Sequence, residues 1–479
     1  MFSVLMKTII RILSRVVFAM AIFGVVAVAS ASDKGRYMEF SELIKSIAAR
    51  QFCYTLVALV VGWFAWRQDY HFYRRPEFMW TVFIATLVLL GLVFAPGIGY
   101  EAGGSKRWIN THVAGVKLQP SEFAKIAMMM LTCAWLDRAG SHVRRFREGI
   151  LIPGLALGAV AGLILLQTDL GATVVLLTAC GVVLFAAGVR FWAHLLPIAG
   201  AGALVLALVV YCVPYCKKRV EAFTASMQGC EVVEVVDLKF ANAAAEELAK
   251  NKKILPKKVE ASQLGLKNDR VVWYFKKEKE LPLDQWEAGS GLLATKIPGL
   301  SAEAALDATN IVCILTDRRR AEAREHVEMS KEAFRNGDLT GVGFMRSKYK
   351  KYILQEAHTD FIGAIIGEEF GFIGMFLLLC GYGTILVCGI YISARAPDRF
   401  GKYLAFGMTF LLTSQAGINL GVITGVLPTT GIALPFMSYG GTSIVASMIA
   451  AGVILNVGRK ALEAKVSDEA NVFRDAAKI

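Results

Sequence analysis

The stretch that decides the fold runs from Gln355-Glu-Ala-His-Thr-Asp-Phe361 into Ile365-Ile-Gly-Glu-Glu-Phe-Gly-Phe-Ile-Gly374. It places ionisable side chains at the mouth of a long apolar run, and two further carboxylates, Glu368 and Glu369, inside or beside that run. An ionisable group at bilayer depth costs roughly 2.5–3.5 kcal/mol on insertion scales, so such groups mark a functional site by default. The stretch therefore predicts a membrane helix with chemistry at its entrance.

The composition of the whole chain also indicates a membrane protein. Its 479 residues are 55% hydrophobic and only 19% charged, and the mean hydropathy is +0.51. Apolar runs near the length that a helix needs to cross ~30 Å of hydrocarbon predict an all-α polytopic membrane protein with about ten transmembrane helices. The predicted spans are residues 9–31, 52–66, 78–96, 120–136, 149–167, 170–189, 191–213, 364–392, 401–420 and 437–457.

Lys and Arg residues predict how these spans are oriented. Every second short loop is basic, beginning with the start of the first span and ending with the segment after the tenth. Because basic loops stay on the cytoplasmic side, we expect a multi-pass protein of the cytoplasmic (inner) membrane with both termini in the cytoplasm. Ala29-Ser-Ala31 imitates a cleavage site, but the length of the first apolar run favours an uncleaved span.

The net charge of +13 is explained in part by the basic residues of these loops. The basic residues are scattered over both predicted sides of the membrane, so the sequence gives little support to nucleic-acid binding. The nine cysteines show no metal-ligand spacing, and we predict no metal site. No cofactor is indicated, although a divalent cation remains possible.

A polar segment interrupts the membrane pattern between the seventh and eighth spans. It predicts a small α/β extracytoplasmic insertion, with strands near 231–240, 270–275 and 311–315 and helices near 241–255 and 302–308. The chain then divides into a membrane domain of residues 1–228, an inserted domain of residues 229–322, and residues 323–479 with the last three spans. The insertion is either a folded spacer or a docking module for a partner.

The distinctive motifs lie in the loops predicted to face outward. They are Gly103-Gly-Ser-Lys-Arg-Trp-Ile109, Gln119-Pro-Ser-Glu-Phe-Ala-Lys125, Gln167-Thr-Asp-Leu-Gly171, Asn419–Gly431 and Leu434–Ser443. Together with Glu356–Asp360, their order, topology and spacing resemble the SEDS family (shape, elongation, division and sporulation), the lipid-linked peptidoglycan polymerases of the FtsW/RodA type. The resemblance covers the chain outside the insertion, and Pro428-Thr-Thr-Gly431 leans to the division type, FtsW.

This resemblance implies a glycosyltransferase that polymerises lipid II into glycan strands at the outer face of the cytoplasmic membrane. It implies lipid II and the growing lipid-linked glycan as substrates. It also implies a class B penicillin-binding protein transpeptidase, with other division or elongation proteins, as partners. The family's required aspartate corresponds to Asp360, a base that would take a proton from the acceptor sugar hydroxyl. Thr359 would cap the helix that begins there, whose dipole would favour the ionised carboxylate.

The remaining candidates are assigned to substrate binding. They are Arg107, Gln119, Glu122, Lys125, Asp169, Lys350, Glu356, His358, Ser438, Gly440 and Gly441. Arginine suits bidentate phosphate contact, although Arg107 could equally be an interfacial residue. Glu122 and Lys125 are spaced to pair on one helical face. The amides of the last loop could cradle phosphate or sugar, or the loop could be purely structural.

Three positions depart from the family pattern. Gln355 and Thr168 stand where the family has proline, and Tyr349 stands where it has glutamine. Two other functions use the same features: a flippase for the lipid-linked precursor, and a non-catalytic scaffold of the cell-wall machinery. Transport would need charged motifs at both leaflets, and here nearly all of them lie at one face. The sequence therefore favours chemistry at that face.

Overall fold

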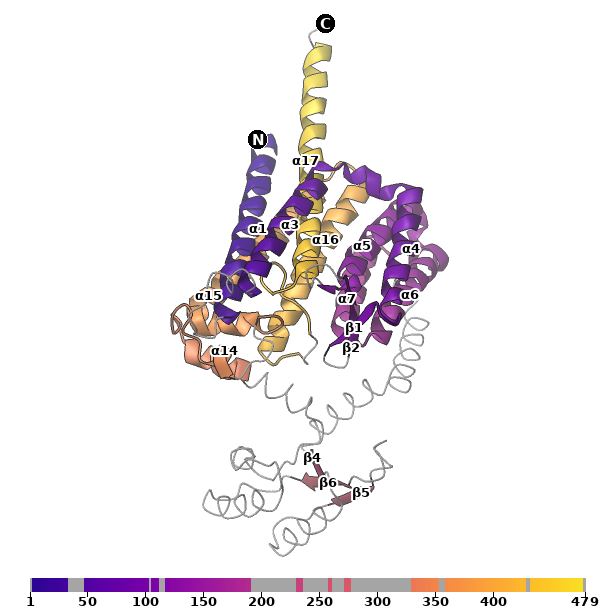
Figure 1. Ribbon diagram of the computed structural model, residues 1–479. Helices are drawn as coiled ribbons and strands as arrows, with labels where there is room; N and C mark the ends of the chain where they lie inside the picture. Colours follow the sequence, from indigo (N-terminus) through magenta and orange to yellow (C-terminus); the bar gives the residue numbers. More distant parts are fainter. Residues whose placement is uncertain are drawn as a thin grey trace, which may run out of the picture. The chain divides into compact units, whose positions relative to one another are not determined.

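The structure is a computed structural model that describes residues 2–32, 47–102, 105–111, 117–190, 230–235, 257–260, 271–276, 329–352, 358–427 and 431–476. The chain divides into two compact units, one formed by Met1–Leu196 with His326–Ile479 and the other by Pro197–Glu325. The first unit is a bundle of α-helices (Figure 1).

The helices of this bundle follow the predicted apolar runs. They are α1 (Phe2–Ser32), α3 (Ile47–Arg67), α4 (Pro76–Leu92), α5 (Pro120–Ala139), α6 (Ile152–Leu166), α7 (Leu170–Ala186), α15 (Ile362–Ala394), α16 (Arg399–Ile423) and α17 (Gly441–Ala476). Within the described residues, six helical segments are long and apolar enough to cross a membrane, and α4 and α7 are shorter apolar helices. Nine predicted spans therefore coincide with helices, and the predicted span 191–213 lies outside the described residues.

Helix α5 is enclosed mainly by other helices. Most of its side chains are buried, and it packs against α4, α7 and α16. A helix that is enclosed by other helices can carry polar groups on several faces if those groups find partners. This explains how Glu122 and Lys125 are held inside the bundle.

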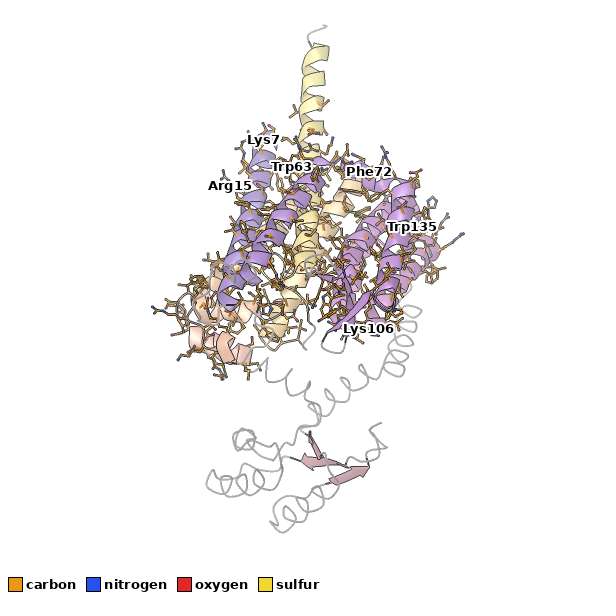
Figure 2. All side chains as sticks on the ribbon, in the orientation of Figure 1. Lys7, Arg15, Trp63, Phe72, Lys106 and Trp135 are labelled. Atoms are coloured by element: carbon orange, nitrogen blue, oxygen red, sulfur yellow. The ribbon has the colours of Figure 1, made fainter. Side chains whose placement is uncertain are left out.

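The basic loops gather at one end of the bundle. Arg138 donates from Nη2 to the carbonyl of Arg74 at 2.7 Å, and Arg459 donates from Nη2 to the carbonyl of Arg67 at 3.0 Å. The start of α1 and the end of α17 lie at this same end (Figure 1). Figure 2 labels Lys7 there and Lys106 at the opposite end. The basic loops that alternate along the sequence thus lie together at one end of the bundle.

Short elements complete both ends of the bundle. The 3-10 helices η1 (Tyr70–Arg74) and η2 (Gly140–Arg144), followed by the π-helix η3 (Arg147–Leu151), connect helices at the basic end. At the opposite end, β1 (Gly99–Ala102), β2 (Ser105–Asn110) and β3 (Lys117–Leu118) form an antiparallel sheet in the order β1–β2–β3. Helix α14 (Tyr349–Tyr352) also lies there (Figure 1).

Helices α3 and α17 cross closely at a pair of glycines. A Cβ added to Gly452 would lie 2.4 Å from the carbonyl oxygen of Gly62, and one added to Gly62 would lie 3.0 Å from the carbonyl oxygen of Met448. Small residues allow the backbones of membrane helices to approach in this way. The contact fixes α17, and with it the loop that precedes it.

Helix α15 is broken at Gly371, whose φ of 63° and ψ of −159° are not helical. Residues 338–343 satisfy the backbone groups freed at the break. The amides of Val342 and Gly343 donate to the carbonyls of Glu368 and Glu369, while the amides of Phe372 and Ile373 donate to the carbonyls of Asp338 and Leu339. Irregular backbone at membrane depth needs such internal partners. The apolar run therefore folds as two helical pieces joined by a packed loop.

The second unit contributes three described strands. They are β4 (Cys230–Val235), β5 (Lys257–Glu260) and β6 (Val271–Lys276), antiparallel in the order β4–β6–β5. The predicted strands 231–240 and 270–275 correspond to β4 and β6, whereas β5 was not predicted. The predicted helices 241–255 and 302–308 and the strand 311–315 lie outside the described residues. The proposed domain bounds of 1–228, 229–322 and 323–479 stay predictions.

Candidate active site

Asp360 precedes α15 rather than forming its first turn. The helix begins at Ile362, its N-cap residue is Phe361, and no side chain caps it. The prediction that Thr359 is the N-cap was therefore wrong. Residues 358–361 form a turn instead, and the reason lies in what their carbonyl groups bind.

Three successive carbonyl groups of this turn accept hydrogen bonds from another part of the chain. The donors to His358, Thr359 and Asp360 are, in order, the Tyr439 amide at 2.8 Å, the Ser438 hydroxyl at 2.7 Å and the Asn419 side-chain amide at 2.8 Å. A helical turn would direct these carbonyls to its own amides. Their external partners hold the segment open and fix Asp360 against the end of α16 and the loop before α17.

The Asp360 carboxylate faces the Arg107 guanidinium across Gly431. A Cβ added to Gly431 would lie 3.4 Å from Oδ2 of Asp360 and also 3.4 Å from Nη1 of Arg107. The two charged groups therefore approach the same point, each at van der Waals distance from where a Cβ of residue 431 would lie. Gly431 itself adopts a φ of 71°, a conformation that favours glycine.

Arg107 extends from β2 and is half buried. Its Nη2 donates to the carbonyl of Thr168 at 2.5 Å. Its Nε is buried without a hydrogen-bond partner in the described part of the chain. A guanidinium fixed in this way presents a positive charge beside Asp360, and arginine suits contact with an anionic ligand.

Asp169 caps the N-terminus of α7. Its Oδ1 accepts from the amide of Ala172 at 3.1 Å, and its Oδ2 accepts from Gln119 at 3.1 Å and from Ser121 at 3.2 Å. The side chain is only 1% exposed. Gln119 and Asp169, two predicted site residues, are thus brought together, but in a buried cluster that ties α5 to α7.

Glu122 and Lys125 form the predicted pair, and Lys125 also reaches a third helix. Its Nζ donates to Glu122 at 2.9 Å and to Oε1 of Gln415 on α16 at 2.7 Å. Gln415 in turn donates from Nε2 to the carbonyl of Ala433 at 2.9 Å. One turn further along α16, Asn419 donates to the carbonyls of Ile432 and Asp360. Gln415 and Asn419 were not predicted as site residues. Two side-chain amides four residues apart lie on one face of a helix, and in an apolar span they could have indicated a site.

The loop before α17 is held by side chains from α3 and α15, in addition to Gln415 and Asn419 of α16. Gln51 of α3 bonds the Ser438 carbonyl and the Gly440 amide, each at 3.3 Å, and Tyr382 of α15 donates to the Pro435 carbonyl at 2.6 Å. The Ser438 hydroxyl accepts from the Leu434 amide as well as donating to Thr359. These groups position the loop, and Gly441 begins α17 directly after it.

His358 is half buried beside the same loop. Its ring centroid lies 5.5 Å from that of Tyr439, with the two planes inclined by 60°. Glu356 lies outside the described residues. Within the described residues, no group of three or more His, Cys, Asp and Glu side chains is arranged to hold a metal ion.

Lys350 lies in a separate buried cluster. Its Nζ donates to Glu369 and to Ser30 of α1, both at 3.0 Å, and the side chains of Lys350 and Glu369 are 0% and 1% exposed. Glu368 accepts from Asn336 at 2.7 Å, from the Ser347 hydroxyl and from the Lys348 amide at 3.0 Å. The two carboxylates fasten residues 336–350 to α15. Ser30 was not predicted.

Comparisons with known proteins show the family to which the chain belongs. The family model FtsW/RodA/SpoVE, described as "Cell cycle protein", matches residues 10–231 and 314–463 and so leaves out most of the predicted insertion. "Probable peptidoglycan glycosyltransferase FtsW" of Trichlorobacter lovleyi is 31% identical over 451 residues, which cover 93% of this chain and 92% of that protein. "Stage V sporulation protein E" of Bacillus subtilis is 29% identical over 439 residues, covering 91% and 93%.

Solved structures share the fold. A chain from "Structural coordination of polymerization and crosslinking by a peptidoglycan synthase complex" has a TM-score of 0.59 at 23% identity and covers 94% of this chain and 97% of its own. The rod shape determining protein RodA of Thermus thermophilus has a TM-score of 0.54 at 20% identity, with 93% and 95% covered. The all-α polytopic membrane fold is thereby confirmed. Since the family model matches most of the residues and the 31% identical relative is covered almost throughout, this chain belongs to the FtsW/RodA/SpoVE family of cell cycle proteins, the SEDS family.

Proposed function

We propose that the protein is a peptidoglycan glycosyltransferase that polymerises lipid II into glycan strands. The observation that carries the proposal is the approach of the Asp360 carboxylate and the Arg107 guanidinium to one point beside Gly431. Chain extension needs a base near the acceptor hydroxyl and a cation near the leaving pyrophosphate. These two side chains supply one of each. The names of the relatives, peptidoglycan glycosyltransferases among them, support the same activity.

In this mechanism Asp360 is the general base. Its carboxylate takes the proton from the acceptor sugar hydroxyl, and the hydroxyl oxygen forms a bond to the anomeric carbon of the donor. The bond from that carbon to the lipid pyrophosphate breaks, and the pyrophosphate leaves with the bonding electrons. Arg107 brings the positive charge of its guanidinium group to the departing phosphates.

The other candidate residues act on position rather than on substrate atoms. Glu122 and Lys125 hold the loop beside Asp360 through Gln415, and Gln119 with Asp169 fixes the start of α7. Ser438 and Gly440 belong to the loop that carries Gly431, the residue between the two charged groups, and Gly441 begins α17 directly after that loop. His358 and Glu356 remain candidates for substrate contact, and Lys350 braces the segment before them.

The setting follows from the orientation of the basic loops. We infer that the basic end faces the cytoplasm, that both termini lie there, and that the site opens at the outer face of the cytoplasmic membrane. A class B penicillin-binding protein transpeptidase, with other division or elongation proteins, is the proposed partner. Reporters fused after residues 140 and 400 should be cytoplasmic, and one inserted near residue 260 should be external. A cytoplasmic reporter at 260 would put the site on the wrong side.

Purified protein given fluorescent lipid II in detergent tests the activity directly. Glycan ladders that require Asp360 are the expected product. If intact protein binds lipid II without forming ladders, even together with a transpeptidase partner, the polymerase proposal is wrong. Transfer of lipid II between leaflets of a vesicle would then indicate a flippase, and recruitment of partners alone would indicate a scaffold.

A further inference from the structure

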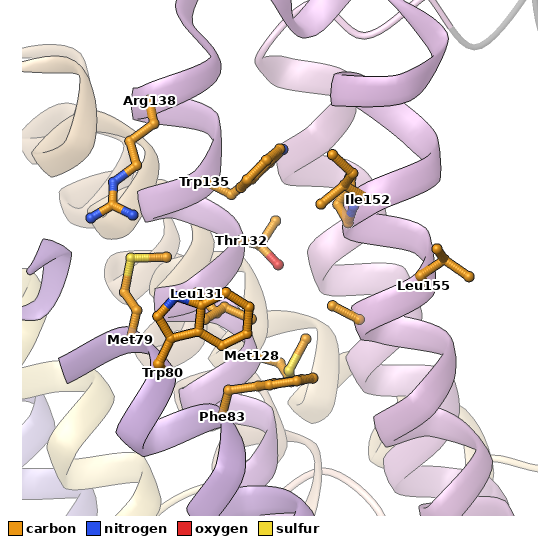
Figure 3. Close-up of a pocket in the computed structure, with 12 residues that line it drawn as sticks. Met79, Trp80, Phe83, Met128, Leu131, Thr132, Trp135, Arg138, Ile152 and Leu155 are labelled. Atoms are coloured by element: carbon orange, nitrogen blue, oxygen red, sulfur yellow. The ribbon is translucent and has the colours of Figure 1, made fainter. Parts of the chain in front are cut away.

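An apolar cavity of about 370 Å³ lies between α4, α5 and α6, near the basic end of the bundle (Figure 3). Its walls are almost entirely hydrocarbon, aromatic ring or thioether, with Thr132 and Arg138 as the polar exceptions. Two of its lining residues, Trp80 and Leu155, are 65% and 67% exposed on the outside of the bundle. The cavity therefore opens sideways, where lipid surrounds a membrane protein.

A hydrogen bond links α5 to the segment that leads into α6. The indole Nε1 of Trp135 donates to the carbonyl of Glu148 at 2.7 Å, which joins the end of α5 to η3. An apolar space of this size offers water few partners, while its volume lies within the ~300–1,000 Å³ of sites that hold small ligands. Its surface suits a hydrocarbon chain.

A basic cleft of about 490 Å³ adjoins this cavity. It is lined by His71, Arg74, Arg75, Pro76, Asp137 and Arg138. Arg138 lines both spaces, and Pro76 is the first residue of α4, the helix that supplies the aromatic wall of the cavity. The two spaces thus share one lining side chain, that of Arg138.

The cleft is positively charged and its guanidinium groups are held in place. Three arginines face one carboxylate, Asp137, whose distance to Arg74 is 3.5 Å. Arg138 is anchored on the Arg74 carbonyl, and Arg75 lies over the ring of Phe72 at 5.4 Å. Arginine side chains at helix ends commonly reach for the interface without binding a particular lipid. Here the three arginines are held by specific contacts beside a hydrocarbon-lined cavity. Arginines that only reach the membrane interface do not need such contacts.

We propose that the cleft and the cavity form one binding site for an anionic phospholipid of the adjacent leaflet. The lipid phosphate lies among Arg74, Arg75 and Arg138, and one acyl chain enters the cavity past Trp80. Basic pockets between membrane helices on the basic side are suited to anionic headgroups. The site lies at the opposite end of the bundle from β2, which carries Arg107, and so differs from the one proposed for catalysis. A bound lipid would stabilise the packing of α4, α5 and α6 against one another.

The test is a competition on the full-length protein in neutral detergent. Phosphatidylglycerol and phosphatidylcholine with identical acyl chains are added in equal amounts, and the lipid that stays bound through gel filtration is quantified by mass spectrometry. We expect phosphatidylglycerol to be retained at least about tenfold better, because each basic residue adds to the attraction of an anionic headgroup. Equal retention of the two lipids would overturn the proposal.

Two sets of variants locate the lipid. Arg74→Gln/Arg75→Gln/Arg138→Gln should abolish the preference, whereas the matched set Arg144→Gln/Arg145→Gln/Arg147→Gln, at the same end but outside the cleft, should keep it. Ala156→Phe fills the cavity and should reduce retention of phosphatidylglycerol; Ala156→Leu gives the same readout if the larger change impairs folding. Unchanged retention by the charge variant, or by a folded cavity variant, would refute the site.

Discussion

The ammonium group of Lys125 lies 2.9 Å from Oε1 of Glu122 and 2.7 Å from Oε1 of Gln415, so it joins α5 to α16 inside the bundle. Through the side-chain amide of Gln415, this contact continues to the carbonyl of Ala433 in the loop beside Asp360. This series of hydrogen bonds is buried. Removal of the Lys125 ammonium group would therefore leave the Glu122 carboxylate and the Gln415 amide oxygen without their partner. A pair that could have been only structural is thus connected to the candidate active site.

Lys125→Ala should lower both the folded yield and the activity. Removing one partner of a buried ion pair costs about 3–5 kcal/mol, because the remaining charge has no compensation. Glu122→Gln/Lys125→Met should recover yield, since no buried charge is left, but should not recover polymerisation. Thermal unfolding in detergent and the lipid II assay measure the two effects.

The matched control for this series is Arg335→Ala. Arg335 pairs with Glu332 at the same spacing of three residues, but the two side chains are 74% and 46% exposed. An exposed pair contributes about 0–1 kcal/mol, so this variant should unfold at nearly the wild-type temperature. Full polymerisation by the Glu122→Gln/Lys125→Met variant would show that the buried pair serves stability alone.

Asp360→Asn should abolish glycan synthesis while leaving the fold intact. The backbone carbonyl of Asp360, not its carboxylate, accepts the hydrogen bond from Asn419, so the substitution keeps that anchor. Loss of a positioned base should reduce the rate by roughly 100-fold or more. Lipid II binding and the amount of protein in the membrane should persist, and Glu356→Gln should be milder. Near-normal ladders from Asp360→Asn would remove Asp360 from the catalytic role.

Glu368→Ala should loosen the segment before α15. Glu368 accepts hydrogen bonds from the Ser347 hydroxyl and the Lys348 amide, and its loss leaves these donors without their acceptor. Trypsin should then cut after Arg346 and Lys348 several-fold faster than in the wild type, as expected when local opening becomes easier. Glu332→Ala, on the exposed pair nearby, is the control. Unchanged cleavage by trypsin would mean that other contacts hold the segment.

Asp69 should contribute stability that depends on pH. Burial alone would raise the pKa of Asp69, but hydrogen bonds from the His71 amide and ring and from Lys460 outweigh burial and lower the pKa to about 2. Because the folded pKa lies below the usual ~3.9, the contribution is complete above about pH 4 and is lost as the pH falls toward 2. Asp69 is 48% exposed, so solvent screening limits it to about 1 kcal/mol or less.

Melting temperatures of the wild type and Asp69→Asn, compared from pH 7 to pH 2, measure this contribution. The wild type should melt higher at neutral pH, and the difference should vanish between about pH 4 and pH 2. A difference that stays constant down to pH 2 would contradict the assignment.

The spans could be predicted because their signal is local. Residues 364–392 were predicted to cross the membrane, and α15 runs from Ile362 to Ala394. The break at Gly371 could not be predicted, since a single glycine in an apolar run also fits a continuous helix. The break depends on residues 338–343, which donate to and accept from the interrupted backbone. Hydropathy carries no information about that partner.

The candidate site was predictable as a group of loops but not in its details. Topology alone brings the motifs of Arg107, Asp169, Asp360 and Ser438 to one end of the bundle. The turn at Asp360 depends on donors from α16 and from the loop before α17, far along the chain. Thr168, which stands where the family has proline, adopts a φ of 61° that proline cannot reach. Departures of this kind change local geometry in ways that a motif does not reveal.

The broken helix also bears on how the protein is made. Unbroken, the 33 residues of α15 would be about 50 Å long, whereas the hydrocarbon core is only ~30 Å thick. The backbone partners of the break, residues 338–343, precede α15 in the chain and leave the ribosome before it does. The break can therefore be completed as soon as α15 is inserted. The donors that anchor Asp360, on Asn419, Ser438 and Tyr439, are synthesised later, so the turn at Asp360 acquires its anchors only after α15 has been made.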